Sequence, residues 1–182
     1  MCDINPDATQ AQTEADPDAD IRGAVIVAAI PGQPARVLLE GAHYAKLMHA
    51  PLVVVHVDVT RFVTYEDPDG FVHSAPIDLN IAPGASELEE VRAAAAAAFD
   101  PKGVAWTLRQ LVGDPAIAIK QLADRIDAKL LVVGTRNRGI GESIREFFTG
   151  SVAARLAHRQ HRPILVVPLG DPAADDEELW VE

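Results

Sequence analysis

The strongest constraint on the fold is an alternation of short, continuous apolar runs with segments that have one apolar helical face. We expect buried strands at 24–30, 52–59, 104–112, 130–133 and 163–167. A continuous apolar run of this length suits a strand that is buried on both faces. Strands that alternate with helices predict an α/β fold, in which a parallel sheet carries helices on both faces. Ligands of such sheets bind at the carboxyl ends of the strands, where the winding direction reverses.

Start signals mark the helices between these runs. Pro34 suits the first turn of one helix, and Ser86 is expected to cap a second. Asp114 followed by Pro115 predicts the start of a third, and the last helix is expected from about 151 to 160. These signals support the alternating order.

The connection over 60–86 is too long for an ordinary turn. It contains a Pro-Asp-Gly turn at 68–70, so a long loop and a small hairpin are both open. Connections of this length in compact domains are usually functional or mobile.

Charge is distributed unevenly along the chain, which has 27 acidic and 16 basic residues. Segments 1–20 and 170–182 hold six acids each and no base, which leaves 15 acids against all 16 bases in 21–169. We therefore predict one domain over 21–169 between a disordered acidic tail at 1–20 and an acidic C-terminal tail at 170–182. Acidic tails repel polyanions and argue against nucleic-acid binding.

Localisation signals are also missing from the sequence. The N-terminus lacks the basic and apolar regions of a signal peptide, and no apolar run approaches the ~20 residues of a membrane span. A single cysteine, Cys2, excludes an intramolecular disulfide. We expect a cytoplasmic protein with no membrane association.

The segment 134–151 leaves a predicted strand, is rich in glycine and feeds the last helix. Glycines allow close backbone approach, and N–H groups at a helix start attract anions. Arginine suits bidentate phosphate contacts, and for Arg136 and Arg138 a phosphate-facing and a solvated role are both open. Arg155, Arg159 and Arg162 are expected to form a solvated face.

Two standard nucleotide motifs are excluded. Gly134 and Gly139 have the spacing of a Walker loop, but Ile140 stands where that loop needs lysine. Gly139 and Gly141 lack the third glycine of the dinucleotide fingerprint, because residue 144 is isoleucine.

The stretch VVGTR…GSVAARLAHRQHRPILVVP, within 130–168, resembles the C-terminal half of universal stress proteins, and the similarity extends over most of 22–168. The resemblance implies a Rossmann-like, five-stranded parallel sheet in the order 3-2-1-4-5. ATP-binding members of this family carry G-x2-G-x9-G-[ST] after strand four. Gly134 matches its first glycine, and Gly150 with Ser151 matches its closing pair.

The chain departs from that motif at two points, and from the pattern of ATP-binding relatives at a third point after strand one. Asn137 occupies the second glycine position, and twelve residues rather than nine separate it from Gly150. ATP-binding relatives have an Asp just after strand one, where this chain has Ala-Ala-Ile-Pro-Gly-Gln from Ala28 to Gln33. The resemblance implies ATP or another adenine nucleotide as ligand, with no metal required. The residues expected to bind nucleotide or phosphate are Ala29, Ile30, Pro31, Val57, Gly134, Thr135, Arg136, Arg138, Gly139, Gly141, Gly150, Ser151 and Val152.

No catalytic residue is predicted. His56 is expected to be a core or sheet-face histidine, whereas Asp58 either faces the pocket mouth or has a structural role. His158 and His161 lie near a helix end, where electrostatics favours histidine without a metal. Ser151 has no obvious paired base.

These patterns predict a universal stress protein that binds a nucleotide or other phosphate-bearing small molecule without fast catalysis. The alternative is a dimerising protein-interaction module of the stress response with a vestigial nucleotide pocket, and slow hydrolysis of a bound phosphate stays a third hypothesis. We also expect a homodimer formed through the last strand, at 164–167, because the family pairs there and an exposed apolar edge invites pairing.

Overall fold

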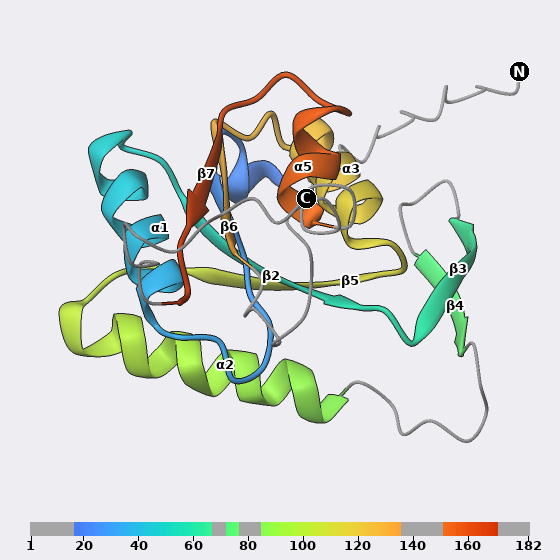
Figure 1. Cartoon of the computed structure of the whole chain (residues 1–182), viewed down its shortest axis with the longest axis horizontal. Coiled ribbons are helices and arrows are strands. Elements are labelled where there is room, and N and C mark those ends of the chain that lie inside the picture. The colour runs from blue at the N-terminus through green and yellow to red at the C-terminus, as the bar shows by residue number, and fades with distance from the viewer. Residues whose placement is uncertain (1–16, 67–71, 77–84, 136–150, 171–182) are drawn as a thin grey trace, which may run out of the picture.

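The computed structural model describes residues 17–66, 72–76, 85–135 and 151–170. In this part of the chain, helices cover both faces of a five-stranded sheet (Figure 1). The strands of this sheet are β1 (Val25–Ala28), β2 (Leu52–Asp58), β5 (Thr107–Val112), β6 (Leu130–Gly134) and β7 (Ile164–Val167). The α-helices are α1 (Arg36–Leu47), α2 (Ala85–Phe99), α3 (Pro115–Arg125) and α5 (Val152–Ala157).

The sheet order is β5-β2-β1-β6-β7, and all its pairs are parallel. Counted along the chain, this is the predicted order 3-2-1-4-5, so the expected fold is confirmed. Val27 in the central strand pairs with Val54 of β2 on one side and Val132 of β6 on the other. The chain therefore winds outward from β1 to β2 and β5, then returns and winds the other way through β6 and β7. The reversal lies between β1 and β6.

Alternate residues of each strand fill one of two apolar cores. Val25 and Val27 pack with α1 and α2, where Phe99 is fully buried. Ile26 and Leu131 pack on the opposite face with α3 and α5, around Leu122 and Leu156. Burial on both faces explains why the strands are continuous apolar runs.

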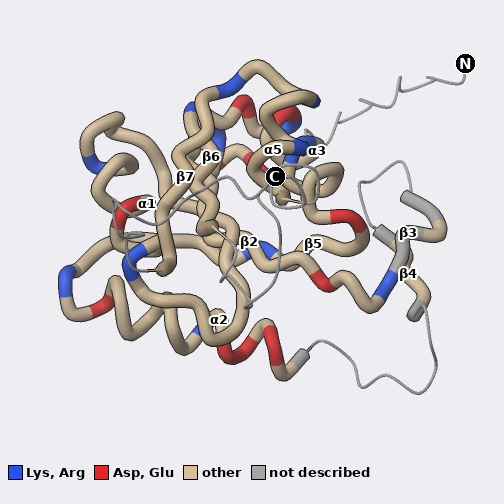
Figure 2. The backbone as a smooth tube through the Cα atoms, in the orientation of Figure 1, with Lys and Arg blue, Asp and Glu red and all other residues tan. Residues whose placement is uncertain are grey.

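Charged residues are absent from β1, β6 and β7, as Figure 2 shows. None of the described helices is long and apolar enough to span a bilayer.

The structure confirms one predicted helix start and contradicts another. Asp114 caps α3, since its Oδ1 accepts a hydrogen bond from the Ile117 N–H at 3.0 Å, and Pro115 is the first helical residue, as predicted. The prediction for Ser86 is wrong, because α2 already begins at Ala85 and Ser86 lies inside its first turn.

The long connection forms a hairpin of two antiparallel strands, β3 (Arg61–Glu66) and β4 (Val72–Pro76). Arg61 holds it together, because Nε donates to Ser74 Oγ and Nη2 donates to the Ser74 carbonyl, both at 2.9 Å. Figure 1 shows the hairpin projecting beyond the end of β2. Of the two open alternatives, the hairpin is the one observed.

Short 3₁₀ helices complete the described elements: η1 (Ala19–Ile21) before β1 and η2 (Asp100–Lys102) after α2. Ile21 is 1% exposed and packs in the core beside α3. Asp18 precedes η1 and is 7% exposed. The distribution of charge along the sequence had placed it in the predicted acidic tail.

Candidate functional site

The carboxyl ends of β1 and β6 lie beside each other at the reversal of the sheet. Thr135 follows β6 directly and extends its pairing, because its N–H donates to the Val167 carbonyl at 2.9 Å. The Thr135 hydroxyl accepts a hydrogen bond from Leu169 N–H at 2.9 Å. The structure thus brings Ala29, Gly134 and Thr135, all predicted site residues, to one edge of the sheet.

The segment after β1 forms a tight turn at this edge. Gln33 N–H donates to the Ile30 carbonyl at 3.3 Å, and Gly32 has a φ of 68°. Proline at the second position and a left-handed glycine at the third are typical of a type II turn. Ile30 is 62% exposed, so Ile30 and Pro31 form a surface of the site edge.

Side chains hold both ends of the peptide group that joins Ala29 to Ile30. The Ala29 carbonyl lies 3.3 Å from Nδ1 of His56, and the Ile30 N–H donates to Oε1 of Gln33 at 3.1 Å. A carbonyl only accepts, so His56 Nδ1 carries the proton of this bond. His56 is 1% exposed, which confirms the prediction of a core histidine.

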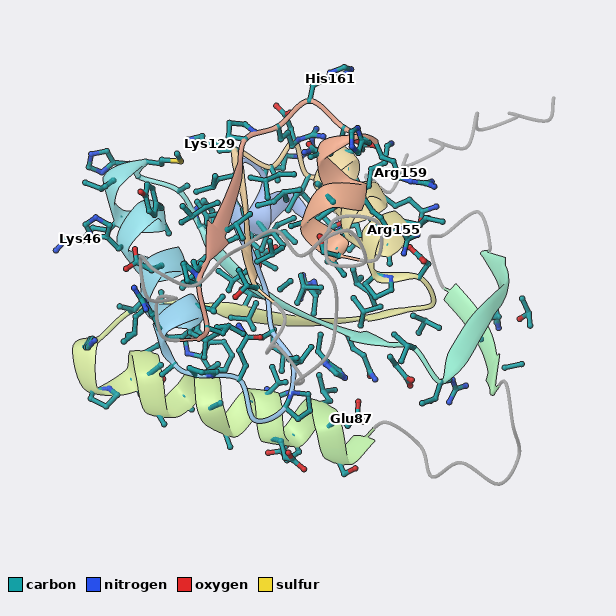
Figure 3. The ribbon with its side chains drawn as sticks, in the orientation of Figure 1. Lys46, Glu87, Lys129, Arg155, Arg159 and His161 are labelled. Carbon is teal, nitrogen blue, oxygen red and sulfur yellow. The ribbon has the colours of Figure 1, made fainter. Side chains whose placement is uncertain are left out.

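The far nitrogen of His56 points toward α2. Its Nε2 lies 3.5 Å from Oε2 of Glu87, without a hydrogen bond. Glu87 belongs to the first turn of α2 (Figure 3) and its side chain is 49% exposed. The imidazole therefore links the exit of β1 to the start of α2.

Asp58 has a structural role at the end of β2. Its Oδ1 accepts hydrogen bonds from the Thr60 N–H at 2.8 Å and from the Thr60 hydroxyl at 2.6 Å, and the residue is 2% exposed. Of the two open alternatives for Asp58, the structural one is therefore observed.

Gly134 is constrained by packing. A Cβ at this position would lie 3.0 Å from Leu169 Cδ1 and 3.2 Å from Val37 Cγ2. Both approaches are tighter than ordinary van der Waals contacts, so the first glycine of the motif lets α1 and the segment after β7 close over the end of β6.

Ser151 directly precedes α5, the helix that follows the glycine-rich segment. Its hydroxyl accepts a hydrogen bond from the Ala154 N–H at 3.1 Å and so acts as the helix cap. The other N–H groups of a first turn have no partner within the helix. Val152 and Val57, both predicted site residues, are partly buried and pack against the core on the α3 and α5 face of the sheet.

Arg155 connects α5 to α3, so the prediction that it lies on a solvated face is wrong. Its Nη2 lies 2.6 Å from Oδ2 of Asp114, the residue that caps α3. Burial raises the pKa of Asp114, but the hydrogen bond and charge of Arg155, with the N–H groups of Ile117 and Ala116, outweigh it and lower the pKa below its usual value. Figure 3 shows Arg155 on the α5 side of the sheet, away from Glu87.

Arg162 is also structural, contrary to prediction. It donates from Nη1 to Asp124 Oδ1 at 2.6 Å and from Nε to the Ala128 carbonyl at 2.9 Å. Hydrogen bonds from Lys120 and Arg162 lower the pKa of Asp124. Arg159 is exposed, as predicted for a solvated face.

No three His, Cys, Asp or Glu residues of the described chain cluster as metal ligands. His158 and His161 are both exposed.

Part of the predicted site lies outside the described residues. This applies to Asn137 and to the glycines and arginines assigned to the phosphate, namely Arg136, Arg138, Gly139, Gly141 and Gly150. The described residues of the predicted site lie at the β1 exit, at the β6 exit, at the start of α5 and, for Val57, in β2.

The sequence analysis did not single out Gln33, which the structure places at the candidate site edge through its bond to the Ile30 N–H. A signal was available, because Gln33 closes a Pro-Gly turn directly after a strand that ends at the predicted site edge.

Comparison with known proteins gives one consistent family. A model of the universal stress protein family matches residues 24–168. The structure of a universal stress protein from Archaeoglobus fulgidus is 24% identical, with a TM-score of 0.58 over 81% of this chain and 99% of that one. A universal stress protein in complex with cAMP is 27% identical, with a TM-score of 0.54 over 82% and 99%. A family member from Burkholderia pseudomallei is 25% identical, with a TM-score of 0.53 over 81% and 97%. No curated protein sequence matches the chain.

Proposed function

Because the chain belongs to the universal stress protein family, we propose that it binds an adenine nucleotide, or another phosphate-bearing small molecule, at the carboxyl edge of β1 and β6. The solved relative that holds cAMP supports this proposal, since it is 27% identical and aligns over 82% of this chain. The ligand would be bound without fast catalysis.

The observation that carries the proposal is the reversal of strand order between β1 and β6. Crevices outside such reversals are the usual ligand sites of open parallel sheets. In this chain the turn from Ile30 to Gln33 and Thr135 lie at the edge of the sheet where this reversal occurs. The glycine-rich segment begins after Thr135 and ends at Ser151, the residue that caps α5.

We favour binding over hydrolysis because the polar side chains near this edge form hydrogen bonds within the protein. His56 and Asp58 are buried and engaged with the Ala29 carbonyl and with Thr60. The Ser151 hydroxyl caps its own helix. Among the described residues these groups are structural, so none is poised as a nucleophile with a base.

Calorimetry tests the proposal. Wild type would be titrated with ATP, AMP, cAMP and inorganic phosphate, and the same titrations would be run on Gly150→Val and on Leu47→Ser as the matched control. We expect at least one nucleotide to bind with micromolar affinity, which is about −8 kcal/mol. Gly150→Val should weaken it, and Leu47→Ser, a change in an exposed residue at the far end of α1, should not. If no phosphate compound binds wild type at millimolar concentration, the proposal fails.

The second candidate is a dimerising interaction module with a vestigial pocket. It is supported by the position of β7, which is an edge strand of the sheet, and by Val166, which is 42% exposed. Unpaired backbone groups of an apolar edge favour pairing with a second chain. We also propose a cytoplasmic location, in keeping with a sequence that contains one cysteine.

A further inference from the structure

The peptide group between Ala29 and Ile30 fixes where Gln33 lies. The Ala29 N–H donates to the Val55 carbonyl at 2.9 Å, and the Ala29 carbonyl accepts a hydrogen bond from His56 Nδ1. Both backbone polar groups of Ala29 therefore point toward β2. The C=O and N–H of a trans peptide point in opposite directions, and no described peptide is cis. The Ile30 N–H therefore points away from β2, toward the β6 side of β1.

Gln33 meets the Ile30 N–H on that side. Its Oε1 accepts from the Ile30 N–H at 3.1 Å, so the carboxamide lies on the β6 side of β1, beyond Val27 and Val132, the last residues that pair between these strands. His56 lies on the opposite side of the same peptide group, next to Glu87 of α2. The two side chains that hold this peptide group thus face different parts of the molecule.

The other end of the carboxamide has no hydrogen-bond partner among the residues that the structure describes. Because an N–H can only donate to the oxygen, the bond to Ile30 identifies Oε1 and leaves Nε2 as the free end. Gln33 Nε2 is buried and has no hydrogen-bond partner, a condition that it shares with His56 Nε2 among the described side chains. A buried donor without an acceptor is unfavourable, so such groups in native proteins require an explanation.

We propose that Gln33 is a specificity-determining residue of the nucleotide site and that its Nε2 donates to an acceptor of the bound ligand. The inference rests on the proposed function and specifies the chemistry of one end of the ligand. A carboxamide nitrogen donates and carries no charge, so this end of the site accepts a keto oxygen, a ring nitrogen, a hydroxyl or a phosphate oxygen. It disfavours an exocyclic amino group, which offers no comparable acceptor.

The Gln33→Glu variant is the sharpest test, because it keeps an oxygen for the Ile30 N–H and replaces the free donor with an acceptor. Gln33→Met is the matched control, since it loses the turn bond and the donor together. Wild type and both variants would be titrated at pH 7.5 with ATP, AMP, cAMP and GMP. The side-chain amide resonances of Gln33, identified by their absence in Gln33→Glu, would be followed in the ¹⁵N spectrum of wild type.

We expect the tightest probe to bind Gln33→Glu at least tenfold more weakly, as for loss of a buried hydrogen bond. The Gln33 amide resonance of wild type should shift on saturation. Equal affinity of wild type and Gln33→Glu would overturn the role of Gln33 and leave nucleotide binding intact. If both variants bind the probe more weakly but the Gln33 amide resonance of wild type does not shift, Gln33 only stabilises the turn. That result would also overturn the inference. Failure of every probe to bind wild type would overturn both proposals.

Discussion

Arg125 donates from Nε to Oδ2 of Asp18 at 2.7 Å, which joins the last turn of α3 to a residue 107 positions earlier. Nη2 of Arg109, in β5, lies 3.9 Å from Oδ1, the other carboxylate oxygen of Asp18. The buried carboxylate holds the start of the described chain against α3 and the edge strand. Asp18 is therefore part of the folded domain, although charge alone grouped it with the acidic tail.

This arrangement predicts different outcomes for two truncations. Deletion of residues 1–16 should leave the melting temperature unchanged, because their composition offers little apolar surface to bury. Deletion of residues 1–20 should lower it by several degrees, because it leaves Arg125 and Arg109 without Asp18. Asp18→Asn in the full chain should reproduce part of the loss. Equal melting temperatures for the two truncations would contradict the structural role of Asp18.

The pair of Asp114 and Arg155 predicts a pH-dependent contribution to stability. The pKa of Asp114 lies below its ordinary value of 3.8 in the folded chain. A depressed carboxyl pKa stabilises the fold above the unfolded value, and this stabilisation is lost as the pH falls below about 3.8 toward the folded pKa.

Arg155→Gln should therefore cost about 0.2–1 kcal/mol of unfolding free energy at pH 7, since both side chains are partly exposed. Urea unfolding at pH 7 and pH 3 would measure it. The difference between wild type and variant should shrink at pH 3, and Asp114→Asn should cancel most of the effect in the double variant. A difference that is constant with pH would exclude the charge pair as its cause.

Gly41 in α1 packs directly on the central strand. A Cβ at Gly41 would overlap Cγ2 of Val27, which is fully buried. Gly41→Ala should therefore destabilise the chain by about 1–3 kcal/mol through overpacking, although alanine is the better helix former. Adding Val27→Ala should recover part of this loss by removing the overlapping methyl group. Denaturant unfolding of the two single variants and the double variant would show the coupling.

The edge position of β7 predicts the assembly. Sedimentation at micromolar concentration should show twice the monomer mass of 19.5 kDa. Val166→Lys should shift the chain toward monomer, because a charge on an edge strand opposes pairing. Ile117→Lys is the matched control, since Ile117 is 41% exposed but belongs to α3. A monomeric wild type would remove the dimer proposal.

The polar contacts at the candidate site were less predictable than the sheet topology that defines its edge. The reversal of strand order located the site edge, and Ala29 and Thr135 lie there. The sequence analysis placed Arg155 on a solvated face because its partner, Asp114, lies 41 residues earlier in the chain and caps another helix. Ion pairs between distant segments leave no periodic signal, so their partners cannot be recognised from local patterns.

The sequence by itself determined the parallel α/β fold, because buried strands must be continuously apolar and helices between them must carry one apolar face. Local chemistry also determined the capped start of α3, since Asp114 and Ile117 are close in the chain. Tertiary structure alone decided the environment of Gln33. Its carboxamide meets the Ile30 N–H through a local turn, but the direction of that N–H follows from the pairing of β1 with β2 and from His56 of the neighbouring strand. Only the assembled sheet places at the exit of β1 a buried donor that has no partner among the described residues.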